Sequence, residues 1–156
     1  YWNGRRKVPW NNESGWRRIG NPMYLLDTNA CIRILNGQSI SVVERLRRQS
    51  PRAVYLCSIV KAELIYGAHR SARPAENVRL LNRFFEPYES LPFDDRCTEI
   101  YGRIRNELER SEMVIGPSDL MIAATAVTHR LVLVTANTRE FSRVINLEIE
   151  NWELDE

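Results

Sequence analysis

The sequence predicts one α/β domain of three layers, in which helices flank a central, mostly parallel sheet. From Met23 onward, short apolar runs alternate with longer segments whose apolar residues have helical spacing. The chain of 156 residues is long enough for one such domain, and its 44% hydrophobic content is ordinary for a globular protein. Functional residues are therefore expected at the carboxyl ends of the strands.

The expected strands are short and rich in apolar residues. They cover residues 24–26, 54–57, 91–93 and 131–135. Residues 147–152 are expected to form a tail after the last helix.

The expected helices fill the intervals. The first ends at Gly37, and the second opens with the capping box Ser41-Val42-Val43-Glu44. The third covers about 59–69, with Ser58 as its N-cap. The others are expected over residues 74–85, residues 95–110, residues 118 or 119 to about 130, and residues 138–141.

Residues 1–22 differ from the rest of the chain. They carry five basic residues against one glutamate, a charge of +4, so residues 23–156 sum to −2. The segment also has three tryptophans, but no helical or strand period. We expect an irregular, non-native or dispensable extension (1–22), a domain from Met23 to Trp152 and a short tail (153–156). The alternative is a basic, aromatic arm that contacts RNA.

Cysteine content and hydropathy suggest a compartment. Cys31, Cys57 and Cys97 are odd in number and scattered, which favours core thiols in a reducing cytoplasm over a disulfide framework. No apolar run approaches the roughly 18 residues of a membrane span. We expect a cytoplasmic protein with no membrane partner.

Three carboxylates stand in apolar surroundings. Asp27 closes the first strand, Glu63 lies inside an apolar helical stretch, and Asp119 opens an almost wholly apolar helix. An unpaired buried carboxylate is costly, so acids placed against a core usually hold a cation. Each acid alone has a plainer explanation as a helix cap or a surface residue. Together with Asn137 after the last strand, they predict a Mg²⁺ or Mn²⁺ site.

Four segments carry a resemblance to a known family. They are LLDTN at 25–29, SIVKAEL at 58–64, IGPSDLMIAA at 115–124 and VTANTREF at 134–141. In this order and spacing they resemble the PIN-domain ribonucleases, specifically the VapC toxins of bacterial toxin–antitoxin pairs. The resemblance implies a Mg²⁺- or Mn²⁺-dependent endoribonuclease that forms a homodimer and is silenced by a VapB-type antitoxin. Its pattern is similar to enteric members associated with initiator tRNA, which favours tRNA as substrate.

The resemblance also implies residue roles. Asp27 and Asp119 match the principal metal ligands, and Glu63 matches the second acid. The fourth acid is open, because Asn137 stands at the strand end and the nearest carboxylate is Glu140. Flanking residues are given supporting roles: Thr28 and Asn29 orient Asp27 and cap the next helix, and Thr135 contacts phosphate or metal-bound water.

The sequence lacks residues that two competing functions require. A haloacid-dehalogenase phosphatase needs a second aspartate two residues after the first, where Asn29 stands. A phospho-receiver domain needs adjacent acids after the first strand, and these are absent. The remaining alternative is a catalytically inactive PIN-like binding module. For the expected dimer, Phe84, Phe85, Ile100 and Ile104 are predicted to be exposed apolar residues.

Overall fold

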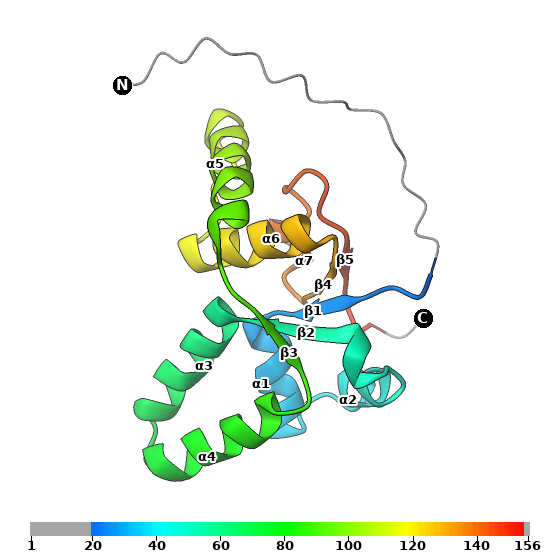
Figure 1. Cartoon of the computed structure of the whole chain (residues 1–156), viewed down its shortest axis with the longest axis vertical. Helices are drawn as coiled ribbons and strands as arrows, with labels where there is room; N and C mark the ends of the chain where they lie inside the picture. Colours follow the sequence, from blue (N-terminus) through cyan, green and yellow to red (C-terminus); the bar gives the residue numbers. More distant parts are fainter. Residues whose placement is uncertain (1–19, 155–156) are drawn as a thin grey trace.

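A five-stranded parallel sheet forms the centre of the molecule (Figure 1). The computed structural model describes residues 20–154, so most of the predicted extension at residues 1–22 lies outside the described residues. The strand order is β3-β2-β1-β4-β5, and all four pairings are parallel. The strands are β1 (Tyr24–Leu26), β2 (Val54–Cys57), β3 (Glu89–Leu91), β4 (Val132–Val134) and β5 (Ile149–Glu150).

Helices cover both faces of this sheet, which confirms the three predicted layers. Helices α1 to α4 lie on one side, and α5 and α6 lie on the other (Figure 1). The helices are α1 (Thr28–Asn36), α2 (Ile40–Arg47), α3 (Ser58–His69), α4 (Pro74–Phe85), α5 (Asp95–Arg110), α6 (Pro117–His129) and α7 (Thr138–Phe141), with a 3₁₀ turn at Pro51–Ala53.

Two predicted helix caps are wrong. Helix α2 begins at Ile40, and the side chain of Ser39 accepts its N-cap hydrogen bond from the amide of Val42. Ser41 instead donates its hydroxyl proton to the carbonyl of Trp152 at 2.6 Å. Likewise Ser58 is the first residue of α3, and its hydroxyl donates to the carbonyl of Leu91. In both places a long-range partner takes the hydroxyl that local pattern assigned to a cap.

The strands at the two edges of the sheet also differ from expectation. Strand β3 ends at Leu91, so it lies two residues earlier than predicted. Only Leu91 is buried in it, and so it has no apolar run to mark its start. Strand β5 has two residues inside the segment expected to be a tail, too few for an alternating pattern.

The core explains the composition of the central elements. Leu25, Leu26 and Leu56 are fully buried in the sheet, and α6 buries residues all around its axis. All three cysteines are free and buried, as predicted. The predicted exposed patch is wrong: Phe85 and Ile104 are buried, and Phe84 and Ile100 are half-buried.

Within residues 20–154, no helix has both the length and the apolar character that crossing a membrane requires.

Candidate active site

The first residue of the site lies at the carboxyl end of β1, which is paired with β2 on one side and β4 on the other. Asp27 follows Leu26 directly, and its backbone N–H donates to the carbonyl of Val134 at 3.1 Å. Its side chain is 4% exposed and accepts a hydrogen bond from the amide of Ala30 at 2.7 Å. Asp27 is thus itself the N-cap of α1, while Asn29 is exposed, which corrects the capping role expected for Thr28 and Asn29.

Burial and hydrogen bonds shift the pKa of Asp27 in opposite directions. Burial raises the pKa of this carboxyl, and hydrogen bonds from the Thr135 side chain and the Ala30 amide lower it. The charges of Glu153 and Glu63 raise it further. Thr135 is fully buried and also accepts a hydrogen bond from the Asn137 amide at 3.0 Å. Its hydroxyl therefore supports Asp27. The expected contact of Thr135 with phosphate or metal-bound water stays a prediction.

Glu63 comes from the second turn of α3 and is half-buried. One of its carboxylate oxygens accepts a hydrogen bond from the hydroxyl of Thr28, at the start of α1. This contact joins two helices next to Asp27. Thr28 consequently orients Glu63, where the sequence suggested that it orients Asp27.

Asp119 lies in the first turn of α6 and is half-buried. Burial raises its pKa to about 6, with further contributions from the charges of Glu140, Glu63 and Asp27. Three other carboxylates are therefore close enough to Asp119 for their charges to act on it. That Asp27, Glu63 and Asp119 form one metal site stays a prediction.

The fourth position distinguishes Glu140 from Asn137. Glu140 lies in the first turn of α7, and among the charges that act on Asp119 its effect is the largest. Asn137 occupies the N-cap position of α7, yet its side chain makes no cap hydrogen bond. The carboxylate near Asp119 is thus supplied by Glu140.

This set of donors fits a hard divalent cation. All four side chains offer carboxylate oxygens, which Mg²⁺ and Mn²⁺ prefer. Burial and mutual repulsion raise the pKa values of Asp27 and Asp119, and a bound cation relieves that repulsion. In residues 20–154, no three His, Cys, Asp or Glu side chains are already gathered as a metal cage. Mg²⁺ does not require one, because it is usually held by one or two carboxylates and keeps several waters.

Sequence reasoning missed one acid whose charge acts on Asp27. Glu153 follows β5 and acts on the pKa of Asp27, and its carboxylate forms an ion pair with Arg33 of α1. The alternating apolar pair Leu147 and Ile149 was the available signal for a strand leading to it. Two such residues are a weak signal for a strand.

The family model described as PIN domain matches residues 24–147. The chain belongs to the PIN-domain family. Curated relatives of this PIN domain include Ribonuclease VapC2 of Rickettsia felis, 38% identical over 132 residues that cover 84% of the chain and 98% of the relative. The tRNA(fMet)-specific endonuclease VapC of Shigella flexneri is 38% identical over 129 residues, which cover 83% of the chain and 97% of the relative.

Solved structures agree with this PIN-domain assignment. The toxin–antitoxin complex VapBC2 from Rickettsia felis, bound to a DNA fragment from its promoter, contains a chain with a TM-score of 0.78 and 37% identity. That match covers 83% of this chain and 98% of the other. DNA-bound VapBC from Salmonella typhimurium gives a TM-score of 0.79 at 37% identity, covering 85% and 99%. The predicted PIN-like fold is confirmed.

Proposed function

We propose that this protein is a divalent-metal-dependent endoribonuclease toxin of the VapC type, neutralised by a cognate VapB-type antitoxin. The observation that carries the proposal is that the charges of Glu140, Glu63 and Asp27 all act on Asp119. The printed names of the relatives, ribonuclease and tRNA(fMet)-specific endonuclease, support the same reaction.

Each acid has a distinct role in this proposal. Asp27 and Asp119 hold Mg²⁺, for which Mn²⁺ can substitute, and Glu63 and Glu140 complete the acidic edge. When bound, the metal lowers the pKa of a water and neutralises charge that develops on the phosphate oxygens. The hydrogen bonds from Thr135 and the Ala30 amide fix Asp27, and Thr28 fixes Glu63.

RNA binding at such an edge requires compensation of charge. Four carboxylates repel a polyanion, so the cation that they hold is what admits the phosphate backbone. We propose tRNA as the substrate, with initiator tRNA as the specific candidate, since two relatives are named tRNA(fMet)-specific endonucleases. Sequencing of cleavage ends after expression in cells tests this, and ends confined to mRNA would contradict it.

The proposed partners are an antitoxin and a second copy of the chain. The VapBC complexes among the similar structures support an antitoxin partner. We propose that the tail of this antitoxin brings an arginine to the acidic edge. The exposed apolar patch that was expected to support a homodimer is not present, because Phe85 and Ile104 are buried. The homodimer is therefore proposed from the family resemblance alone. Light scattering at high protein concentration tests it, and a monomeric mass would refute it. We place the reaction in the cytoplasm, consistent with three free, buried cysteines.

An inactive PIN-like module remains the alternative suggested by Asn137. The presence of Glu140 beside Asp119 argues against it, because a fourth carboxylate is supplied from α7. The deciding experiment is Mg²⁺-dependent cleavage of total RNA by the purified protein. Cleavage that Asp119→Asn abolishes supports the enzyme, and binding without cleavage supports the inactive module.

A further inference from the structure

Helix α3 carries an exposed aromatic residue next to a residue of the candidate site. Tyr66 is 63% exposed and lies three positions after Glu63. At this spacing the two side chains share one face of the helix, with their Cβ atoms about 5–6 Å apart. The hydroxyl of Thr28, the residue after Asp27, donates to the Glu63 carboxylate. The place of Tyr66 beside the site therefore follows from helix geometry and a hydrogen bond.

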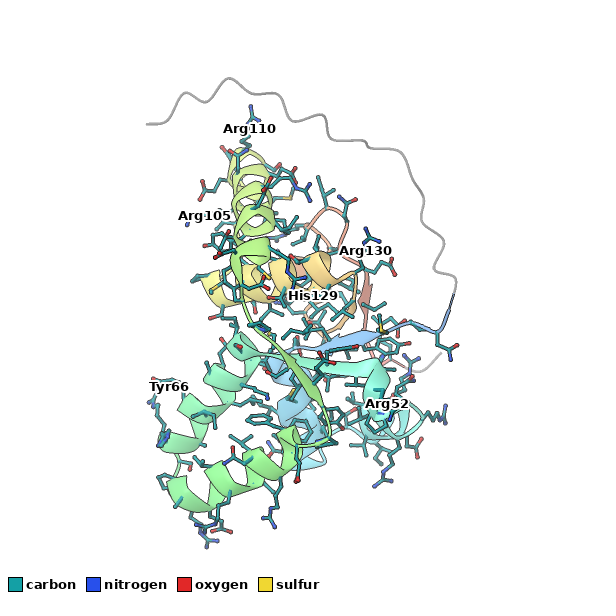
Figure 2. All side chains as sticks on the ribbon, viewed as in Figure 1. Arg52, Tyr66, Arg105, Arg110, His129 and Arg130 are labelled. Atoms are coloured by element: carbon teal, nitrogen blue, oxygen red, sulfur yellow. The ribbon has the colours of Figure 1, made fainter. Side chains whose placement is uncertain are left out.

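The direction of α3 turns this face toward the carboxyl edge of the sheet. The helix begins directly after β2, so its amino end lies at that edge. Side chains of a helix lean toward its amino end, which brings the Tyr66 ring back toward Glu63. Figure 2 shows Tyr66 on the outer side of α3, at the left, whereas Arg52 lies at the right, just before β2. An RNA strand bound at Glu63 therefore has the Tyr66 ring within reach.

Arg70 adds a cation to this face of α3. Its guanidinium lies over the Tyr66 ring, with Cζ 5.7 Å from the ring centroid, and one of its N–H groups donates to the Tyr66 hydroxyl at 3.3 Å. A guanidinium has five N–H groups and covers only one face of a ring. A base can therefore stack on the other face of Tyr66, while the remaining N–H groups of Arg70 bind a phosphate. This combination of aromatic ring and cation binds single-stranded nucleic acids.

Gly67 leaves bare backbone on the same face, between Glu63 and Arg70. It is exposed, and a Cβ atom there would meet nothing within 4 Å apart from adjacent residues and the backbone of its own helix. Packing therefore does not require a glycine, which weakens the interior of a helix. A missing side chain does allow the backbone of a ligand to approach closely.

We propose that an unpaired RNA base near the cleaved bond stacks on Tyr66, that the ribose–phosphate backbone passes over Gly67, and that Arg70 binds a phosphate. Charge favours RNA over a second copy of the chain, because the exposed groups beyond Glu63 are a guanidinium and a phenol instead of an apolar surface. The proposal rests on the proposed function, since it takes RNA as the ligand, and it adds a base-binding subsite to that site.

Binding of two labelled strands tests the proposal. One is a fluorescein-labelled single-stranded RNA of mixed sequence, and the other is an abasic ribose–phosphate strand of the same length. The full-length protein carries Asp119→Asn, so that the RNA stays intact, and affinity is measured over a range of salt concentrations. Tyr66→Ala is compared with Tyr66→Phe, which keeps the ring. Arg70→Gln is compared with Arg52→Gln, which removes the same charge at the opposite end of the sheet (Figure 2).

Stacking and phosphate binding have different signatures in this experiment. Tyr66→Ala should weaken binding of the RNA about 5- to 100-fold, the range for one lost stacking contact, and should leave the abasic strand within about twofold of the parent. Tyr66→Phe should bind both strands as the parent does. Arg70→Gln should make the slope of log affinity against log salt shallower by about 0.7 for both strands, while Arg52→Gln should leave it unchanged.

The backbone path over Gly67 has its own variant. Gly67→Leu should weaken binding of both strands at least threefold without lowering the melting temperature, because leucine is a better helix former than glycine. Affinity equal to that of the parent for both strands would overturn this part of the proposal.

Three further results would overturn the proposal. They are parental RNA affinity for Tyr66→Ala, an equal loss on both strands for Tyr66→Ala, and a parental salt slope for Arg70→Gln. If Tyr66→Ala keeps its RNA affinity but changes from a dimer to a monomer by light scattering, this face is instead an interface between two copies. Melting curves check folding. If Tyr66→Ala is unfolded, Tyr66→Leu replaces it, and the same difference between the two strands is required.

A parallel assay separates this proposal from the proposed function. The protein without substitutions is incubated with the same RNA and Mg²⁺. Cleavage together with parental RNA affinity for Tyr66→Ala contradicts the Tyr66 proposal alone. The expected loss of affinity without cleavage contradicts the nuclease alone, and the absence of both binding and cleavage contradicts both.

Discussion

Asp119 couples the chemistry of the site to the stability of the fold. Its pKa is raised from 3.8 to about 6. A carboxyl whose pKa is higher in the folded state favours folding when protonated. Its contribution is fully present below the unfolded value near 3.8 and is lost as pH rises through about 6. At neutral pH without metal, the site is therefore a source of instability.

Asp119→Asn should stabilise the metal-free protein. At pH 7.5 in EDTA we expect the melting temperature to rise by roughly 2–4 °C, since relief of the repulsion is on the order of 1 kcal/mol after solvent screening. The dependence of melting temperature on pH between 4 and 7 should also flatten. Added Mg²⁺ should raise the melting temperature of the parent more than that of the variant.

Calorimetry measures this, with Asp95→Asn as the matched control. Asp95 is an exposed acid in the first turn of α5, so its substitution should slightly destabilise through the helix dipole. A lower melting temperature for Asp119→Asn than for the parent would contradict the account of the site.

Substitutions of Glu140 and Asn137 test which of the two residues is the fourth member of the metal site. Glu140→Gln should reduce Mg²⁺-dependent cleavage roughly 10- to 100-fold, the usual effect of removing a group that supports a metal site. Asn137→Ala should reduce it only a few-fold, because no cap hydrogen bond of its side chain is lost. Steady-state kinetics on one RNA measure both. The reverse order would assign the fourth position to Asn137.

The sequence was sufficient to single out Asp27, Glu63 and Asp119 and insufficient for other residues. Asp27 and Asp119 were predictable, because a strand end and a helix start place them whatever the rest of the chain does. The choice between Asn137 and Glu140 was not, because it depends on how the four-residue helix α7 turns toward Asp119. Glu153 was missed because the strand leading to it has two residues.

At the scale of elements, apolar pattern predicted the central strands and the seven α-helices of residues 20–154, but not the 3₁₀ turn at Pro51–Ala53. The errors lie where tertiary contacts override local preference. Ser39 and Ser41 are both plausible caps by composition, and the Glu44 three residues after Ser41 favoured the wrong one. The carbonyl of Trp152, 111 positions along the chain, decides the matter by engaging Ser41. No local window contains that information.

The segment after β5 should behave as part of the core. Trp152→Ala should destabilise the protein by about 3–5 kcal/mol, because a fully buried aromatic side chain is removed. Leu154→Ala, two residues later and 64% exposed, should change stability by no more than about 0.5 kcal/mol. Urea unfolding measures both. If Trp152→Ala changed the free energy of unfolding as little as Leu154→Ala does, the segment would be a tail, as its sequence suggested.

For the whole molecule, the open question is the amino-terminal segment. Deleting residues 1–22 should leave RNA cleavage and melting temperature unchanged, since the described end of the segment has exposed residues at Gly20 and Asn21. The slope of log RNA affinity against log salt concentration should also be the same with and without residues 1–22. Both slopes are measured in an Asp27→Asn background, so that the RNA is not cleaved. A clearly shallower line for the truncated protein would instead identify a basic RNA-binding arm.

The measurement that tests the central claim most directly is cleavage of total RNA by the purified protein, with Mg²⁺ and with EDTA, beside Asp27→Asn. The account predicts cleavage by the parent only when Mg²⁺ is present. It predicts none by the folded Asp27→Asn variant, because the substitution removes a metal-holding charge at nearly constant volume. Mg²⁺-dependent cleavage retained by purified Asp27→Asn would contradict the assignment of the site.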